Sequence, residues 1–184
     1  VVSMFECDNI ELERVQMIDN VVLCTNRQAN VLRMDRTLNV SMSAVNFDGN
    51  VGRTGALVLL SSRLIVIDSS RFAYSTSLQD GGALRFDGAR DNNVASSNIT
   101  VVNCTLRNNA ANNGGAIHAN NVRLALRNCR VWHNVGRLGD GGAVRSIGNG
   151  ALSIADCVFR NNTVNDERDV SQIRGGAVVT AVNT

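Results

Sequence analysis

The chain contains no proline and no lysine, so its turns and its positive charges must come from other residues. Without proline one of the usual turn-forming residues is missing, so its 16 glycines and many asparagines must form the turns. All 18 basic residues are therefore arginine, which reflects either genome composition or surface chemistry. Aromatic residues make up only 4% of the 184 residues, although 44% are hydrophobic. A core of Val, Ile, Leu and Ala suits β structure packed in thin layers.

Long apolar runs and strong charge are also missing. No apolar run approaches the roughly 18 residues that a membrane span needs, so we expect no membrane insertion by this segment. The formal net charge is +2 and the two signs are interspersed, which gives no case for nucleic-acid binding. No signal peptide is visible, and the repeat described below reaches both ends. We therefore expect residues 1–184 to be a single segment of a longer chain, without its caps.

A short glycine motif recurs along the chain. Gly-Gly-Ala followed by an aliphatic residue occupies residues 81–84, 114–117, 141–144 and 175–178, with a degenerate copy at 54–57. A signature that returns every 25 to 35 residues is typical of a solenoid of similar coils.

A second motif accompanies the first. It reads aliphatic-x-aliphatic-x-x-small-x-apolar-x-x-Asn and is clearest at residues 99–109, 124–134 and 152–162. Residues 10–20, 40–50 and 65–75 fit the same frame, with Ser75 in place of the final Asn. The small residue recurs at positions 15, 45, 70, 104, 129 and 157, a mean step of about 28 residues.

These motifs predict the fold. Alternation with period two indicates short strands, and the two residues between the halves of the second motif indicate a corner. The segment that contains Gly-Gly-Ala supplies a third strand, whose glycines permit left-handed or crowded backbone. Because each coil must pair with its neighbours to bury its apolar face, the sequence predicts an all-β, right-handed parallel β-helix of six coils.

The asparagine that ends the second motif recurs in five coils. We expect these residues to form a ladder at a tight turn, in which each amide bonds the next and satisfies the turn backbone. A row of polar ligand positions is the alternative. The five residues are Asn20, Asn50, Asn109, Asn134 and Asn162.

Three cysteines occupy successive rungs of the small-residue column and point inward: Cys104, Cys129 and Cys157. They are interpreted as small buried hydrophobes, or else two neighbours form a disulfide. A linear row does not supply the tetrahedral arrangement that zinc needs, and we expect no metal or cofactor. Cys7 and Cys24 lie outside the column and can pair with each other, with further sequence or with neither.

Several outward residues are candidates for contacts or modification. Trp132 and Tyr74 are placed at outward positions just after the inward apolar residue, where an aromatic side chain either contacts a partner or packs under a loop. His118 and His133 have no matching acidic or nucleophilic partner in this frame. N-glycosylation sequons begin at Asn39, Asn98, Asn103 and Asn161.

The pairing of Gly-Gly-Ala-(Ile/Leu/Val) with Phe-x-x-Asn, as at residues 47–50 and 159–162, resembles the repeats of the polymorphic outer membrane proteins. This resemblance covers nearly the whole chain. It implies a β-helical stalk or passenger displayed outside the cell, acting in adhesion or as a rigid spacer, and it brings no catalytic residues. Its partners would be proteins, either other domains of its own chain or neighbouring subunits, or glycans.

A polysaccharide lyase or hydrolase is the alternative function, because β-helices also carry such enzymes. That chemistry needs carboxylates clustered on one face and a basic residue over a groove. Asp68, Asp80, Asp91 and Asp140 fall in different frame positions, and two of them directly precede Gly-Gly-Ala, where turn formation explains them. The sequence therefore favours a non-enzymatic, extracellular or cell-surface scaffold or adhesin segment.

Overall fold

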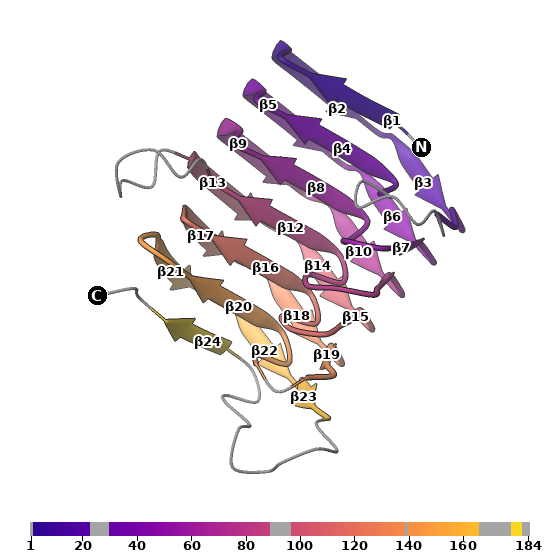
Figure 1. The fold of residues 1–184 in the computed structure, drawn as a ribbon, viewed down its shortest axis with the longest axis vertical. Coiled ribbons are helices and arrows are strands. Elements are labelled where there is room, and N and C mark those ends of the chain that lie inside the picture. Colours follow the sequence, from indigo (N-terminus) through magenta and orange to yellow (C-terminus); the bar gives the residue numbers. More distant parts are fainter. Residues whose placement is uncertain (1, 23–29, 89–96, 139, 166–177, 182–184) are drawn as a thin grey trace.

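The chain winds into a right-handed parallel β-helix, seen side-on in Figure 1. The structure is a computed structural model that describes residues 2–22, 30–88, 97–138, 140–165 and 178–181. Its elements are short strands joined by turns and loops, and each strand pairs in parallel with the equivalent strands of neighbouring coils. The predicted fold class is confirmed.

The strands form four parallel sheets, which we call A to D in the order in which the chain visits them. Sheet A contains β1 (Val2–Phe5), β4 (Leu32–Asp35), β8 (Leu57–Leu60), β12 (Leu84–Asp87), β16 (Ile117–Asn120), β20 (Val144–Ile147) and β24 (Val178–Ala181). Sheet B contains β2 (Asp8–Glu13), β5 (Leu38–Ser43), β9 (Arg63–Asp68), β13 (Ser97–Val102), β17 (Val122–Arg127) and β21 (Ala151–Ala155). Each of the six predicted coils thus contributes one strand to sheet B.

The other two sheets are built from shorter strands. Sheet C contains β3 (Gln16–Ile18), β6 (Asn46–Asp48), β10 (Arg71–Ala73), β14 (Thr105–Arg107), β18 (Arg130–Trp132) and β22 (Val158–Arg160). Sheet D contains β7 (Val51–Gly52), β11 (Thr76–Ser77), β15 (Ala110–Ala111), β19 (Val135–Gly136) and β23 (Thr163–Val164).

The register agrees with the alignment of the repeats. On sheet B, Ile65 pairs with Ile99 and Leu124 with Leu152, so the aliphatic positions of the second motif stack in one inward column. On sheet C, Phe47 pairs with Phe72, and their rings stack with centroids 5.2 Å apart. Because the register keeps like residues together, the apolar core runs continuously along the helix axis.

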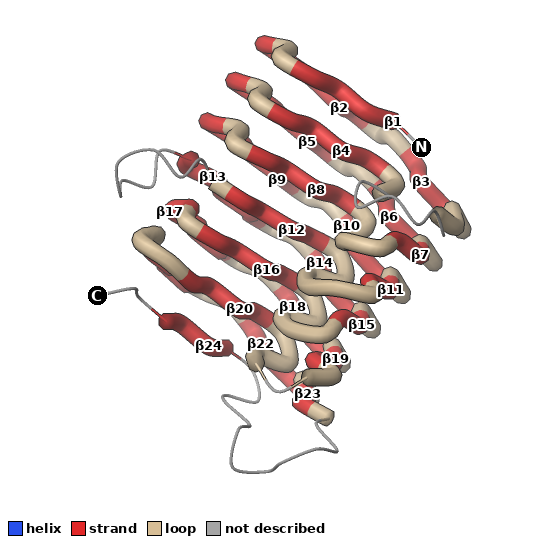
Figure 2. The backbone as a smooth tube through the Cα atoms, in the orientation of Figure 1, coloured by secondary structure: helices blue, strands red, loops and turns tan. Residues whose placement is uncertain are grey.

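The prediction of three strands per coil is wrong, because the coils contain a fourth. Sheet D follows the asparagine of the second motif, and each of its strands has only two residues. The Gly-Gly-Ala segment is itself a turn, and the strand of sheet A begins at the aliphatic residue after it. Figure 2 shows these loops in tan, stacked along one side of the helix between sheets D and A.

Left-handed residues make the corners on either side of sheet C. The corner between sheets B and C has positive φ at Ser69, Asn103 and Asn128, among others. The corner between sheets C and D has positive φ at Tyr74 and His133. Asparagine adopts this conformation more readily than most residues, which accounts for part of the abundance of Asn. The two ring-bearing residues at the second corner are therefore turned outward by the backbone.

The two glycines of the Gly-Gly-Ala turn have different roles. Gly114 has φ +58°, a conformation that an L side chain rarely adopts. A Cβ on the next residue, Gly115, would lie 2.2 Å from the carbonyl oxygen of Gly142 in the following coil. A Cβ on Gly82 would likewise lie 2.2 Å from the carbonyl oxygen of Gly115. The first glycine thus permits the turn and the second permits the coils to stack at backbone distance.

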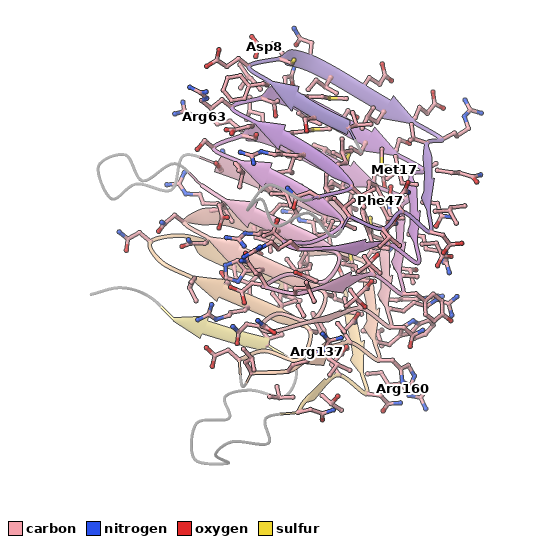
Figure 3. All side chains as sticks on the ribbon, turned by 45° about the vertical axis from the view of Figure 1, so that its right-hand side comes forward. Asp8, Met17, Phe47, Arg63, Arg137 and Arg160 are labelled. Carbon is pink, nitrogen blue, oxygen red and sulfur yellow. The ribbon has the colours of Figure 1, made fainter. Side chains whose placement is uncertain are left out.

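Side chains fill the interior from all faces, as Figure 3 shows with Phe47 inside and Arg160 projecting from the surface. The middle coils are fully covered, whereas Met17 in the first coil and Phe159 in the last described full coil are only partly buried. Among the described residues, no helix has the length and apolar character to span a membrane.

Candidate functional site

The asparagines of the second motif form a column at the corner between sheets C and D. The backbone N–H and side-chain Nδ2 of Asn109 both donate to Oδ1 of Asn134, each at 3.0 Å. Asn134 bonds Asn162 in the same way, at 3.0 and 2.9 Å, and Asn20 bonds Asn50 at 3.1 and 3.0 Å. Asn109 and Asn134 are fully buried, so these bonds satisfy polar groups that have no access to water.

Each amide also supports the coil before it. Nδ2 of Asn134 donates to the carbonyl oxygen of Leu106 at 3.0 Å, and Nδ2 of Asn109 donates to that of Phe72 at 3.0 Å. Ser75 interrupts the column: its N–H donates to Asn109, but within the described residues no hydrogen bond joins it to Asn50. The column has the hydrogen bonding of a structural ladder, and at Asn134 the amide accepts two bonds and donates two.

The cysteine column lies inside the corner between sheets B and C. Cys104 and Cys129 are each 1% exposed, and Cys157 is half-buried in the next coil. Hydrogen bonding to Cys129 and burial raise the pKa of Cys104, while the hydrogen bond from Cys104 lowers the pKa of Cys129 to about 7. The four described cysteines, which include Cys7, have free thiols, and Cys24 lies outside the described residues. Burial leaves the two inner thiols without access for reagents or metals.

The four sequon asparagines are all exposed. Nδ2 of Asn39 donates to Asn9 at 2.8 Å, and Nδ2 of Asn103 donates to Asp68 at 2.9 Å. Attachment of a glycan at either nitrogen would leave it a single hydrogen to donate. Within the described part of the chain, no hydrogen bond engages the side-chain amides of Asn98 and Asn161.

The two aromatic candidates lie in neighbouring columns, and the prediction that they share one position is wrong. Trp132 ends β18 and pairs with Arg107, which pairs with Ala73. Tyr74 follows Ala73 at the left-handed corner, one position further along, with 48% of its surface exposed. The second motif already contained this offset, because Tyr74 directly precedes Ser75 whereas Trp132 lies two residues before Asn134.

Arginines surround these aromatics on the outer surface of sheet C. The guanidinium carbon of Arg107 lies 5.1 Å from the centroid of the Tyr74 ring, a cation–π contact. Arg160 pairs with Trp132 on the following coil, and His133 follows Trp132 at the corner. We call Tyr74, Arg107, Trp132, His133 and Arg160 the aromatic–arginine face.

The aromatic–arginine face is hollowed. A shallow pocket of about 450 Å³ is lined by Arg107, Asn108, Trp132, His133, Arg160 and Asn161. These residues come from three successive coils, so the pocket follows the helix axis. It combines positive charge, an aromatic ring and amide groups, and carboxylates are absent from its described lining.

A second polar cluster covers the outer surface of sheet A. His118 pairs with Arg85 on one side and Arg145 on the other, and the loop before β12 covers it to 3% exposure. Its Nδ1 lies 3.8 Å from Oδ2 of Asp80 and has no hydrogen-bond partner among the described residues. Burial lowers the pKa of His118, and the Asp80 charge opposes this. The prediction that His118 has no acidic neighbour is therefore wrong.

The carboxylates near His118 are engaged by arginines. Nε of Arg145 lies 3.2 Å from Oδ2 of Asp140, and Nε of Arg85 lies 2.7 Å from Oδ2 of Asp87. Asp68 lies on sheet B, and Asp91 is outside the described residues. Sequence reasoning missed the cluster because a loop brings Asp80 onto the next coil. The sequence did contain one indication of the cluster: Arg85, His118 and Arg145 each follow the aliphatic residue after Gly-Gly-Ala, so they share one outward column.

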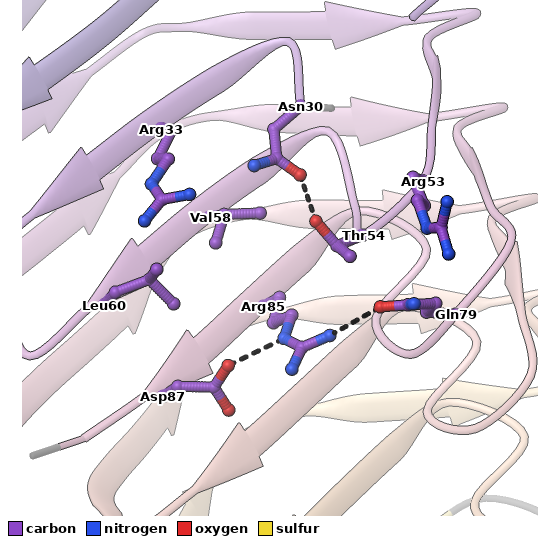
Figure 4. A pocket seen from close by; sticks show the side chains of 9 residues that line it. All are labelled: Asn30, Arg33, Arg53, Thr54, Val58, Leu60, Gln79, Arg85 and Asp87. Atoms are coloured by element: carbon purple, nitrogen blue, oxygen red, sulfur yellow. Dashed lines mark hydrogen bonds and ion pairs between the residues drawn. The ribbon is translucent and has the colours of Figure 1, made fainter. Parts of the chain in front are cut away.

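Beside this cluster lies a pocket of about 380 Å³, shown in Figure 4. It is lined by Asn30, Arg33, Arg53, Thr54, Val58, Leu60, Gln79, Arg85 and Asp87. Arg33 is held by Asp35 at 2.9 Å, and Arg85 contacts both Asp87 and Gln79. Arg33 and Arg85 therefore have their charge balanced within the fold by Asp35 and Asp87.

The described residues contain no cluster of three or more His, Cys, Asp or Glu side chains able to hold a metal ion. No curated protein matches the chain. A family model described as "Right handed beta helix region" matches residues 30–184, which is most of the sequence and includes both the sheet A pocket and the aromatic–arginine face. The chain therefore belongs to the right-handed β-helix family.

Proposed function

We propose that this chain is a segment of a non-enzymatic β-helical scaffold that binds a partner through its aromatic–arginine face. The observation that carries this proposal is the grouping of Tyr74, Arg107, Trp132 and Arg160 over a shallow pocket on one side of the helix. Tyr74 and Arg160 are exposed and Trp132 and Arg107 are half-buried. Aromatic and arginine side chains are the residue types enriched at binding hot spots.

The interior supports the role of scaffold. Stacked apolar columns run through the coils, and asparagine bonds join most neighbouring coils, which suits a rigid rod that holds a surface in place. Equivalent surface positions on such a rod repeat once per coil, at a spacing of roughly 4.8 Å, so a partner can contact several coils in a row. The partner is a protein, either another domain of the same chain or a neighbouring subunit, or a glycan.

The location proposed is extracellular or at the cell surface. The resemblance to polymorphic outer membrane protein repeats supports this, as do the exposed sequons, two of which have side-chain amides with no hydrogen bond among the described residues. In a secretory setting such an exposed asparagine can accept a glycan. Adhesion, or spacing of an adhesive domain, is the activity that this location implies.

The test is competition for attachment. Purified chain is added to cells that produce the protein, and their attachment to the native substratum is measured. Wild-type chain should reduce attachment, and a Tyr74→Ala/Trp132→Ala variant should not. Arg123→Gln, exposed on sheet B of the same coil as Trp132, is the matched control and should compete like the wild type. Equal competition by all three proteins would refute the proposed face, and staining of intact cells by an antibody tests the location.

Cleavage of a carbohydrate is the second candidate, and the cluster around His118 is the observation that favours it. Arg85 and Asp87 line the adjacent pocket, so a basic group and a carboxylate meet over a groove on sheet A. If this function holds, the chain should generate new reducing ends from an acidic polysaccharide, and Arg85→Ala should abolish them. Unchanged polysaccharide after prolonged incubation would reject it.

A further inference from the structure

The outer surface of sheet C has an uneven charge distribution. Its C-terminal half has Arg107, Arg130 and Arg160 at outward positions of β14, β18 and β22. None of these three forms an ion pair with a carboxylate in the described ranges. In the N-terminal half, by contrast, Arg71 is paired with Asp48. The unpaired arginines therefore concentrate positive charge around Trp132.

We infer that the aromatic–arginine face binds an acidic polysaccharide whose chain runs along the helix axis and carries a carboxylate on every second sugar. This inference rests on the proposed function and names the partner of the same surface. Arginine supplies a planar fork of donors that matches a carboxylate in a bidentate arrangement. The charge of the face is thus complementary to such a chain.

The distance between the two arginines of the face determines how far apart the acidic groups of the ligand must be. Arg107, Trp132 and Arg160 occupy one column on successive coils. Rungs in a sheet are about 4.8 Å apart, so the two arginines are separated by about 10 Å with the indole between them. An extended sugar chain with one acidic group in each pair of sugars presents charges at a comparable interval. A neutral sugar would then lie against Trp132.

The remaining groups of the face also suit sugars. The flat indole can stack on the apolar face of a pyranose ring, and Asn108, His133 and Asn161 line the same pocket with hydrogen-bonding groups for hydroxyls. Tyr74 extends the aromatic surface by one coil beside Arg107. An acidic peptide would use the arginines but has no regular flat ring for Trp132. A nucleic acid would demand more phosphate contacts than the two arginines of the face provide.

The chain has a single tryptophan, so its fluorescence reports directly on this face. Hyaluronan oligosaccharides, which carry one carboxylate per two sugars and no sulfate, are titrated into the full 184-residue chain. We expect a saturable change in Trp132 emission that weakens as salt is raised, because the exposed charges are screened. Neutral cello-oligosaccharides of the same length should cause no change.

Substitutions then assign the contacts. Arg107→Gln and Arg160→Gln should each weaken binding about tenfold, equivalent to about 1.4 kcal/mol, and Arg123→Gln should leave it unchanged. Since Arg160 and Arg123 are exposed, neither change disturbs the core. Trp132→Phe keeps a stacking ring, and calorimetry should show that it retains most of the affinity that Trp132→Ala loses.

Three results would overturn the inference: no binding of hyaluronan, equal weakening by Arg123→Gln, or equal or tighter binding of polyglutamate or single-stranded DNA. Failure here is distinguishable from failure of the proposed function. If Trp132→Ala abolishes attachment while hyaluronan does not bind, the polysaccharide is wrong and the interaction face stands. If Trp132→Ala affects neither attachment nor hyaluronan binding, both are wrong.

Discussion

Replacement of Ser75 by asparagine should stabilise the protein, because Ser75 interrupts the asparagine column. At the Asn134 rung the side chain accepts two bonds from Asn109, donates to Asn162 and donates to a carbonyl of the preceding coil. An asparagine at position 75 would accept from Asn50, donate to Asn109 and donate to the carbonyl of Phe47. Four hydrogen bonds are therefore available in place of the single 3.3 Å bond that the Ser75 hydroxyl makes.

The expected gain in the free energy of unfolding follows from the net contribution of each hydrogen bond. Each contributes about 0.5–1.5 kcal/mol after the exchange with water. Ordering the longer side chain costs part of this, so we expect Ser75→Asn to raise the free energy of unfolding by about 1–2 kcal/mol. Urea unfolding should show a higher midpoint with an unchanged slope.

The matched control is Ser75→Asp, which has nearly the same shape as asparagine but lacks the amide donor and adds a buried charge. It should destabilise the protein, because position 75 is fully buried. If Ser75→Asn proves neutral, or as destabilising as Ser75→Asp, the ladder does not contribute to stability as described.

Three further changes test other parts of the structure. Asn134→Ala should lower the free energy of unfolding by about 3 kcal/mol, since it leaves buried donors and acceptors unpaired, whereas Asn98→Ala on the surface should change urea unfolding little. Gly115→Ala should cost about 3 kcal/mol or more, because its Cβ would meet backbone of the next coil; a normal melting temperature would contradict this. Burial lowers the pKa of His118 below 6.5 in the fold, so only the unfolded state gains this proton as pH falls through 6.5, and stability should drop. His118→Gln should remove that part of the pH dependence and His133→Gln should not.

The columns of the core could be predicted from the sequence, because stacking places the same residue type at the same point of every coil. The small-residue positions 45, 70, 104 and 129 fall one residue before paired residues of sheet C, as the alignment requires. The fourth strand could not be predicted, because strands such as Val51–Gly52 and Ala110–Ala111 are too short to show alternation.

The surface was harder to predict, because it depends on corners and loops. Tyr74 lies one column away from Trp132, in the column of His133, and the spacing of the second motif already indicated this offset. The contact between His118 and Asp80 crosses from one coil to the next through a loop whose length varies among the repeats. Arg107 and Arg160 occupy the same position of the second motif as Trp132, and the observed register agrees with that alignment. The alignment therefore contained the signal for this column, although neither arginine was singled out.

Photo-crosslinking in the native setting tests the binding face most directly. A photoreactive amino acid is placed at position 132 on sheet C and, in a second protein, at position 123 on sheet B of the same coil. The proposed face predicts a crosslinked partner from position 132 and none from position 123. Crosslinks from position 123 alone, or in equal yield from both, would contradict the assignment of partner binding to the aromatic–arginine face.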